Sequence, residues 1–191
     1  MRSSILPLVL LSALIFAGCG SSYPNRTPIG ETFPTVTGKS LAGDEVIIPD
    51  AFRGKKVILV LAYEQDAQFD VDRWGIGFFT ADFDLPPVYE IPTIPGLLPS
   101  LFKDAIDGGM RKGIPKESWR DVITVYGGGG GTLSKWTGTE NDLNARIVLL
   151  DEQGVVRWFH DRGYGLPPLQ DLLETLKRDQ ESTVDPAGTG S

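Results

Sequence analysis

The sequence predicts an α/β domain, because apolar runs typical of buried strands alternate with apolar spacings typical of helices. Residues 57–63 form a continuous apolar run rich in β-branched residues, as in a central strand that is covered on both faces. Further along, residues 146–150, the polar turn 151–154 and residues 155–159 predict an antiparallel hairpin. A closing helix follows, with one apolar face made of Leu169, Leu172, Leu173 and Leu176.

Between the first strand and the hairpin, the sequence predicts two helices and two strands. Val71, Trp74 and Phe78 share one face of a short helix, which two glycines inside it weaken. The other elements are a strand over residues 88–91, a helix over 98–106 that ends at Gly108, and a strand over 122–126. The predicted fold is therefore a central sheet flanked by helices.

The five glycines at residues 127–131 directly follow the last of these strands. They match no phosphate-binding pattern, since Thr132 and Leu133 stand where G-x-x-x-x-G-K-[ST] requires Lys and then Ser or Thr. Glycine also leaves the backbone with the greatest conformational freedom. We therefore predict a flexible, Gly-rich insertion before the final hairpin.

Residues 1–18 have the pattern of a lipoprotein signal peptide. Arg2 precedes an apolar stretch over residues 5–16, which is shorter than the roughly 20 apolar residues that span a bilayer. Phe16-Ala17-Gly18-Cys19 resembles a bacterial lipobox, in which the chain is cut before a cysteine that receives lipid. We predict that Cys19 is lipidated and that its acyl chains anchor the chain to a membrane. The alternative is an ordinary secretory signal with an incidental cysteine.

The composition divides the remaining chain into three parts. Residues 19–28 are a polar tether, residues 29–178 are the folded domain, and residues 179–191 are a disordered tail with few apolar side chains. Gly20, rather than Asp, follows the predicted lipid site. This favours the outer over the inner membrane, with the domain in the cell envelope facing the periplasm or the exterior.

The residue counts exclude several classes of function. The chain has one cysteine, Cys19, and one histidine, His160, too few for a Cys-rich zinc site or a multi-histidine metal centre. Its net charge of −7 argues against nucleic acid as a partner. Asp161 follows His160, but a G-x-S-x-G motif is missing, so we expect His160 at the surface end of a hairpin strand. We predict no cofactor and no metal.

The segment Gly30-Glu31-Thr32-Phe33-Pro34, residues 38–60, and the final hairpin with its helix resemble redoxin and peroxiredoxin-type domains. This resemblance implies a thioredoxin-like fold over most of residues 29–178, with an N-terminal extension. More narrowly, Tyr63-Glu64-Gln65, Trp74 and the segment 89–95 are similar to the mitochondrial ATP synthase assembly-factor family, the subunit-10 type. That similarity implies a role in assembly rather than in redox turnover.

The chain departs from the redox-active members of this fold at two places. Thiol oxidoreductases carry cysteines in the loop after the first core strand, where a helix N-terminus lowers the thiol pKa. Here that loop, residues 64–70, contains no cysteine. Asn144-Ala145-Arg146 also occupies the place of the proline that usually precedes the third core strand. We therefore expect a redox-inactive domain that is not an enzyme.

The same loop is acidic. Four carboxylates within nine residues suit the first turn of a helix, whose dipole favours negative charge, although a cation could also bind them. The calcium-loop pattern D-x-[DN]-x-[DN]-G is missing. The candidate binding loop consists of Glu64, Gln65, Asp66, Gln68, Asp70, Trp74 and Pro92. Trp119 and Trp136 lie in loop-like sequence and are further candidates for a partner surface.

Together these features predict a membrane-anchored, redox-inactive, thioredoxin-like lipoprotein that binds another protein or assists assembly. Its partners would be the membrane, through Cys19, and a protein. The alternative is a cation-dependent enzyme or cation-binding protein that uses the acidic stretch from Glu64 to Asp72.

Overall fold

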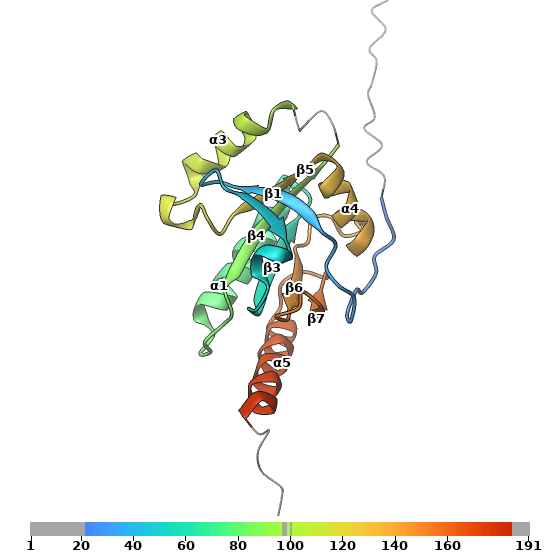
Figure 1. Cartoon of the computed structure of the whole chain (residues 1–191), viewed down its shortest axis with the longest axis vertical. Helices are drawn as coiled ribbons and strands as arrows, with labels where there is room; N and C mark the ends of the chain where they lie inside the picture. Colours follow the sequence, from blue (N-terminus) through green and yellow to red (C-terminus); the bar gives the residue numbers. More distant parts are fainter. Residues whose placement is uncertain (1–21, 97–98, 100, 185–191) are drawn as a thin grey trace, which may run out of the picture.

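The computed structural model describes residues 22–96, 99 and 101–184. The predicted signal peptide and Cys19 lie outside these residues. The described chain forms one sheet of seven strands in the order β2-β1-β5-β4-β3-β6-β7 (Figure 1). The strands are β1 (Val36–Ser40), β2 (Glu45–Ile48), β3 (Val57–Ala62), β4 (Val88–Pro95), β5 (Ile123–Tyr126), β6 (Arg146–Leu150) and β7 (Val156–His160). The helices are α1 (Gln68–Thr80), α3 (Lys103–Gly113), α4 (Gly127–Thr137) and α5 (Leu166–Val184).

Strand β3 lies near the middle of the sheet, as its continuous apolar sequence predicts. It pairs in parallel with β4, Leu59 opposite Tyr89, and antiparallel with β6, Leu59 opposite Val148. Strand β7 continues the sheet beyond β6 as the predicted antiparallel hairpin. The α/β class and the flanking helices are thus confirmed.

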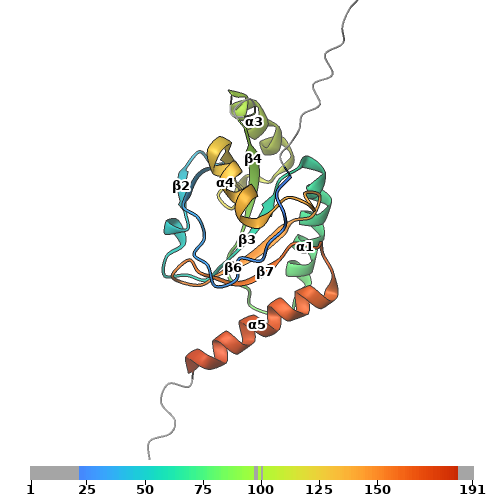
Figure 2. The same ribbon diagram turned by 90° about the vertical axis from the view of Figure 1, so that its right-hand side faces the viewer.

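Helices cover both faces of this sheet (Figures 1 and 2). On one face, Leu133 and Trp136 of α4 pack into a core with alternate β3 residues and Phe33. On the other face, α1 and α5 pack their apolar stripes against the remaining β3, β6 and β7 residues. Val71, Trp74 and Phe78 come from α1, and Leu169, Leu172 and Leu176 come from α5.

Helix α4 corrects the prediction of a flexible insertion, because all five consecutive glycines lie inside it. The helix approaches the sheet so closely that side chains would not fit at two of these positions. A Cβ on Gly130 would lie 2.9 Å from the backbone of Ile94 and Pro95, and one on Gly129 would lie 2.9 Å from Val125. Close backbone packing on the sheet therefore holds a helix that intrinsic propensity disfavours.

Other elements differ from the prediction mainly in their ends. Strand β4 extends to Pro95 rather than residue 91. Helix α3 begins at Lys103 and continues past Gly108 to Gly113. Helix α5 continues to Val184, so residues 179–184 are helical rather than part of a disordered tail, while residues 185–191 lie outside the described residues. The hairpin of β1 and β2 within the N-terminal extension was not predicted as strands.

The predicted tether is also partly bound to the domain. Residues 23–26 run along the end of α4, where the Arg26 N–H donates to the Thr137 carbonyl at 3.2 Å. Pro28 is buried. The predicted tether is therefore bound to the domain from Tyr23 onward.

Candidate protein-binding surface on helix α1

The loop after β3 divides into an exposed and an inward-facing part. Glu64, Gln65, Asp66 and Gln68 are exposed, as expected for a binding loop. Ala67 is fully buried and fixes the short 3₁₀ turn of Gln65–Ala67 against the domain. Asp66 lies just before α1, where the helix dipole favours a negative charge. This part of the predicted site is available to a partner.

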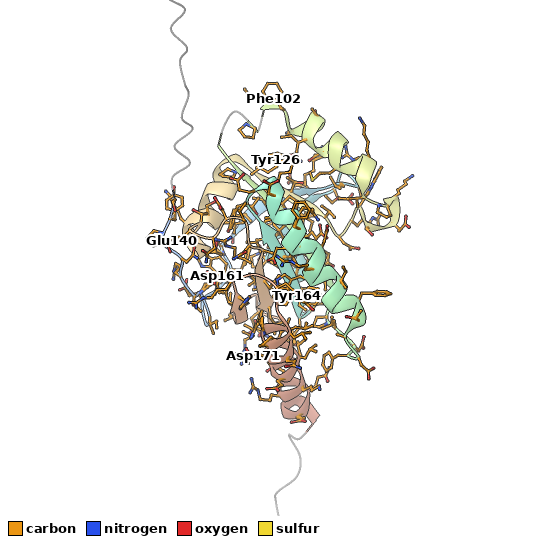
Figure 3. All side chains as sticks on the ribbon, turned by 180° about the vertical axis from the view of Figure 1, so that it is seen from behind. Phe102, Tyr126, Glu140, Asp161, Tyr164 and Asp171 are labelled. Atoms are coloured by element: carbon orange, nitrogen blue, oxygen red, sulfur yellow. The ribbon has the colours of Figure 1, made fainter. Side chains whose placement is uncertain are left out.

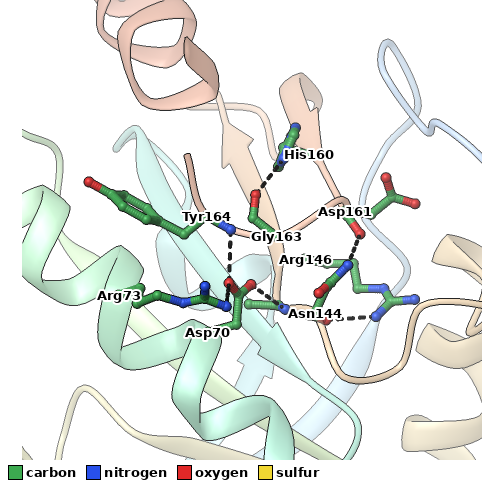
Figure 4. Close-up of polar contacts among 9 residues, drawn as sticks. Asp70, Arg73, Asn144, Arg146, His160, Asp161, Gly163 and Tyr164 are labelled. Atoms are coloured by element: carbon green, nitrogen blue, oxygen red, sulfur yellow. Dashed lines mark hydrogen bonds and ion pairs between the residues drawn. The ribbon is translucent and has the colours of Figure 1, made fainter. Parts of the chain in front are cut away.

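Asp70 points inward and is bound by three groups (Figure 4). Its carboxylate accepts the Ala145 N–H at 2.9 Å and the Tyr164 N–H at 2.8 Å, and it pairs with Arg73 at 3.0 Å. It therefore joins α1 to the segment before β6 and the segment after β7. The structure removes Asp70 from the candidate binding loop, because its carboxylate is buried and already hydrogen-bonded.

Trp74 is also buried and belongs to the core beneath α1. Its ring meets Trp158 and Tyr164 edge to face, with ring centroids 6.3 and 5.3 Å apart. His160 stacks on Trp158, and its Nε2 lies 2.9 Å from the Gly163 carbonyl oxygen. His160 is the last residue of β7, as predicted, and is half-buried. Trp74 is therefore not free to meet a partner.

Arg146 belongs to the segment that replaces the proline usual before the third core strand of this fold. It is fully buried. Its guanidinium donates to the carbonyls of Gly138, Asn141 and Asn144 at 2.7–3.0 Å and lies 4.9 Å from the Tyr63 ring centroid. Burial lowers the pKa of Arg146, and burial raises the pKa of Tyr63 to about 12. These contacts fix the loop before β6, so the group has a structural role.

The outer face of α1 carries large apolar side chains that the sequence-based prediction missed. Phe69, Ile76 and Phe79 are 74%, 64% and 91% exposed. Their spacing of seven and then three residues places them along one side of the helix. We call these three residues the α1 outer face. Figure 3 shows α1 at the front of the molecule when it is seen from behind. The signal was present in the sequence, but α1 is apolar on more than one side and only the Trp74 side was recognised.

Acidic groups surround the α1 outer face. Residues 64–84 contain six Asp or Glu residues and a single basic residue, Arg73. Asp72 is exposed and accepts a hydrogen bond from Gln68 at 2.9 Å. Glu90 on β4 is half-buried, and burial, followed by the nearby Asp72, raises the pKa of its carboxyl. Pro92 follows on the same strand and is half-buried.

The structure gives no support to a cation site in the acidic stretch. Among the described residues, no group of three or more His, Cys, Asp or Glu side chains could hold a metal ion. Asp70 turns into the core, while Glu64 and Asp66 face solvent.

The two tryptophans predicted to form a partner surface are also packed against the domain. Trp136 is buried against Phe33 and donates to Glu31 at 3.1 Å. Trp119 is half-buried, donates to the Ile114 carbonyl at 3.0 Å, and has Arg111 over its ring. They stabilise the fold rather than forming an open surface.

Comparison with solved structures identifies the fold. Yeast Sco1 with copper bound matches with a TM-score of 0.56 at 13% identity, over 80% of this chain and 94% of that one. A putative protein disulfide isomerase from Bacteroides thetaiotaomicron matches with a TM-score of 0.50 at 19% identity, over 85% and 97%. The fold is thioredoxin-like. An exposed lipoprotein thioredoxin, Etrx1, from Streptococcus pneumoniae strain TIGR4 is also similar, with a TM-score of 0.49 at 15% identity over 76% and 99%.

Comparison of the sequence itself gives no family. No protein-family model matches the chain, and no curated protein matches it. The resemblance to the ATP synthase assembly-factor family therefore stays a prediction. Within the described part of the chain, no helix is both long and apolar enough to cross a membrane.

The expectation that the domain is not an enzyme is contradicted. The thioredoxin-like fold is shared with a protein named as a putative disulfide isomerase, so the fold gives no basis for excluding enzyme activity. At these identities the likeness shows the fold alone, and redox activity of this chain is not shown. The single cysteine, Cys19, lies outside the described residues.

Proposed function

We propose that the chain is a lipid-anchored module of the bacterial cell envelope that binds another protein through the α1 outer face. The observation that carries the proposal is the exposure of Phe69, Ile76 and Phe79 on one side of a single helix. Exposed apolar patches of this kind mark interaction sites more often than scattered single residues do. Burying apolar surface contributes about 25 cal/mol per Å², so aromatic residues are effective contacts.

The charges around this face define the chemistry of the partner. Five of the six acidic residues between positions 64 and 84 are exposed, against one basic residue, so the surface favours a partner that combines apolar side chains with Lys or Arg. An amphipathic helix with a basic rim has this chemistry. Glu64, Asp66 and Gln68 of the candidate binding loop are exposed beside the start of α1 and would meet the basic rim.

Two sequence features support the anchored, assembly-type role. The lipobox-like segment Phe16-Ala17-Gly18-Cys19 supports lipidation and a place in the envelope, with the outer membrane preferred because Gly20 follows. The similarity of residues 63–65, 74 and 89–95 to the ATP synthase assembly-factor family supports a role in assembly.

Site-specific photo-crosslinking in the native host tests the proposed surface. A benzophenone amino acid replaces Phe79 in one version of the full chain and Leu143, which is exposed in the loop between α4 and β6, in a control. We expect one protein to be captured repeatedly from position 79 and not from position 143. In the position-79 chain, Phe69→Ser with Ile76→Ser should abolish this capture, while thermal unfolding stays unchanged.

Equal capture from both positions, or capture that survives the two Ser substitutions, would contradict the proposed surface. The anchor is tested separately. Incorporation of labelled palmitate should disappear in Cys19→Ser, and label that persists would exclude Cys19 as the lipid site.

A further inference from the structure

Residues 23–26, which follow the predicted lipid site, are hydrogen-bonded to the domain. The Tyr23 N–H donates to Thr139 Oγ1 at 3.0 Å, and the Thr139 N–H donates back to the Tyr23 carbonyl at 2.8 Å. Asn25 and Glu140 exchange a second pair of bonds, each from a backbone N–H to a side-chain oxygen, at 2.9 and 3.1 Å. Gly138 allows this approach, because a Cβ there would overlap the Asn25 backbone.

This attachment leaves few residues between the predicted lipid site and the bound segment. Only Gly20, Ser21 and Ser22 separate Cys19 from Tyr23. Four extended residue steps span at most about 14 Å. A folded domain of this size has a radius of gyration of about 15 Å and is therefore wider than the tether is long. An anchor at Cys19 must then hold one particular side of the domain against the membrane.

We infer that the lipid anchor orients the domain, with the surface around Asn25, Glu140, Asn141 and Arg162 on the bilayer headgroups and the far end of the α1 outer face, Ile76 and Phe79, turned to solution. This inference rests on the proposed lipidation of Cys19. It adds a second interaction surface, whose partner is the headgroup layer of a phospholipid bilayer.

The chemistry of this membrane-facing surface fits headgroups rather than acyl chains. A hollow of about 580 Å³ lies there, lined by Asn25, Glu140, Asn141, Asn144, Asp161 and Arg162. A smaller hollow of about 200 Å³ adjoins it through Asn25, Asp161 and Arg162 and adds Arg26 and His160. Polar side chains of both charges can stay hydrated among headgroups, whereas moving them into hydrocarbon would be costly.

The α1 outer face points elsewhere. The N-terminal segment docks at the end of α4, whose side chains pack on one face of the sheet, whereas α1 packs on the opposite face. Figure 3 shows the far end of α1 away from the start of the described chain. The anchored domain would thus present Ile76 and Phe79 to partners in the aqueous phase, and the membrane would not cover them.

Fluorescence quenching on vesicles tests the orientation. The full, lipidated chain is purified from its host and reconstituted in phosphatidylcholine vesicles that carry a nitroxide on the lipid headgroup. A fluorophore is attached to Asn141→Cys or to Asp82→Cys; an acylated Cys19 does not react with the label. Asn141 lines the larger hollow, and Asp82 follows the far end of α1. We expect most of the fluorescence to be lost at position 141 and little at position 82.

A longer tether provides the control. Twenty Gly and Ser residues inserted between Ser21 and Ser22 have a root-mean-square length of about 25 Å, which should remove most of the difference between the two positions. If the difference persists unchanged, the short tether is not its cause and the inference is overturned. Equal quenching in the original chain overturns the orientation but leaves the anchor intact. A mass spectrum without acyl chains on Cys19 overturns the anchor itself, and the orientation with it.

Discussion

Helices α1 and α5 cover one face of the sheet with large side chains, whereas the other face is covered by α4, which begins with five glycines. On the first face, Trp74, Trp158 and the leucines of α5 fill the space between helix and strand. On the second, Gly129 and Gly130 let the helix backbone rest almost directly on β4 and β5. The comparison shows two ways to bury a sheet: filling a wide gap with side chains, or closing the gap with backbone. Each way fails under a different substitution.

The largest change in stability is expected on the face that α1 and α5 cover. Trp74→Ala removes a fully buried indole and should lower the free energy of unfolding by about 3–5 kcal/mol. Phe79→Ala on the same helix is the matched control, because its ring is 91% exposed and its loss should change stability by less than about 0.5 kcal/mol. Urea unfolding measures both. Similar losses would mean that the two sides of α1 are not buried as described.

The next largest effect concerns the link between α1 and the strands on the same face. Asp70→Ala leaves the Ala145 and Tyr164 N–H groups without their acceptor and should cost about 3 kcal/mol. Arg73→Ala removes only the more exposed partner of Asp70 and should cost less than about 1 kcal/mol. Denaturant unfolding of the two variants separates the backbone bonds from the ion pair. A greater loss in Arg73→Ala would contradict the role given to Asp70.

On the face that α4 covers, stability should respond to an added side chain. Gly130→Ala places a methyl group 2.9 Å from the Ile94 and Pro95 backbone and should cost about 1–3 kcal/mol. Gly131→Ala, the next residue in the helix, meets nothing within 4 Å and should stabilise by about 0.5–1 kcal/mol, since alanine favours a helix. We expect thermal unfolding to show a loss of stability for Gly130→Ala and a gain for Gly131→Ala. Stabilisation by both substitutions would show that α4 does not rest on β4.

The difference between the two faces of the sheet also explains which helices could be predicted from the sequence. The periodic apolar residues of α1 and α5 identified both helices, because side-chain burial leaves a repeating pattern. Helix α4 was missed because its first five residues are glycines, which leave no apolar pattern, and its contacts through Leu133 and Trp136 are too few to reveal a period. At the candidate site, Glu64, Gln65, Asp66 and Gln68 are exposed, and their contact with a partner stays a prediction. Asp70 was not, because an acidic residue in a helical first turn gives no sign that its partners are backbone groups distant in sequence.

The last effect, at the end of α4, depends on pH. The Tyr63 hydroxyl is buried and lies 2.6 Å from Thr137 Oγ1 at the end of α4, and burial raises its pKa to about 12 from an ordinary value of 10.0. A raised folded-state pKa means that the folded protein keeps this proton between pH 10 and 12 while the unfolded chain loses it. The stability contributed by Tyr63 is therefore complete below pH 10 and is lost as pH rises, by about 1.4 kcal/mol for each unit.

Urea unfolding at pH 9, 10 and 11 measures this loss. In Tyr63→Phe, stability should be lower at pH 9 because the bond to Thr137 is gone, but it should fall less between pH 10 and 11 than in the wild type. Tyr126 also has a pKa raised by burial, and it contributes the same decline to both proteins. If the decline is equal in the two proteins, Tyr63 is not held neutral by burial, and α4 covers this face less tightly than its glycine contacts indicate.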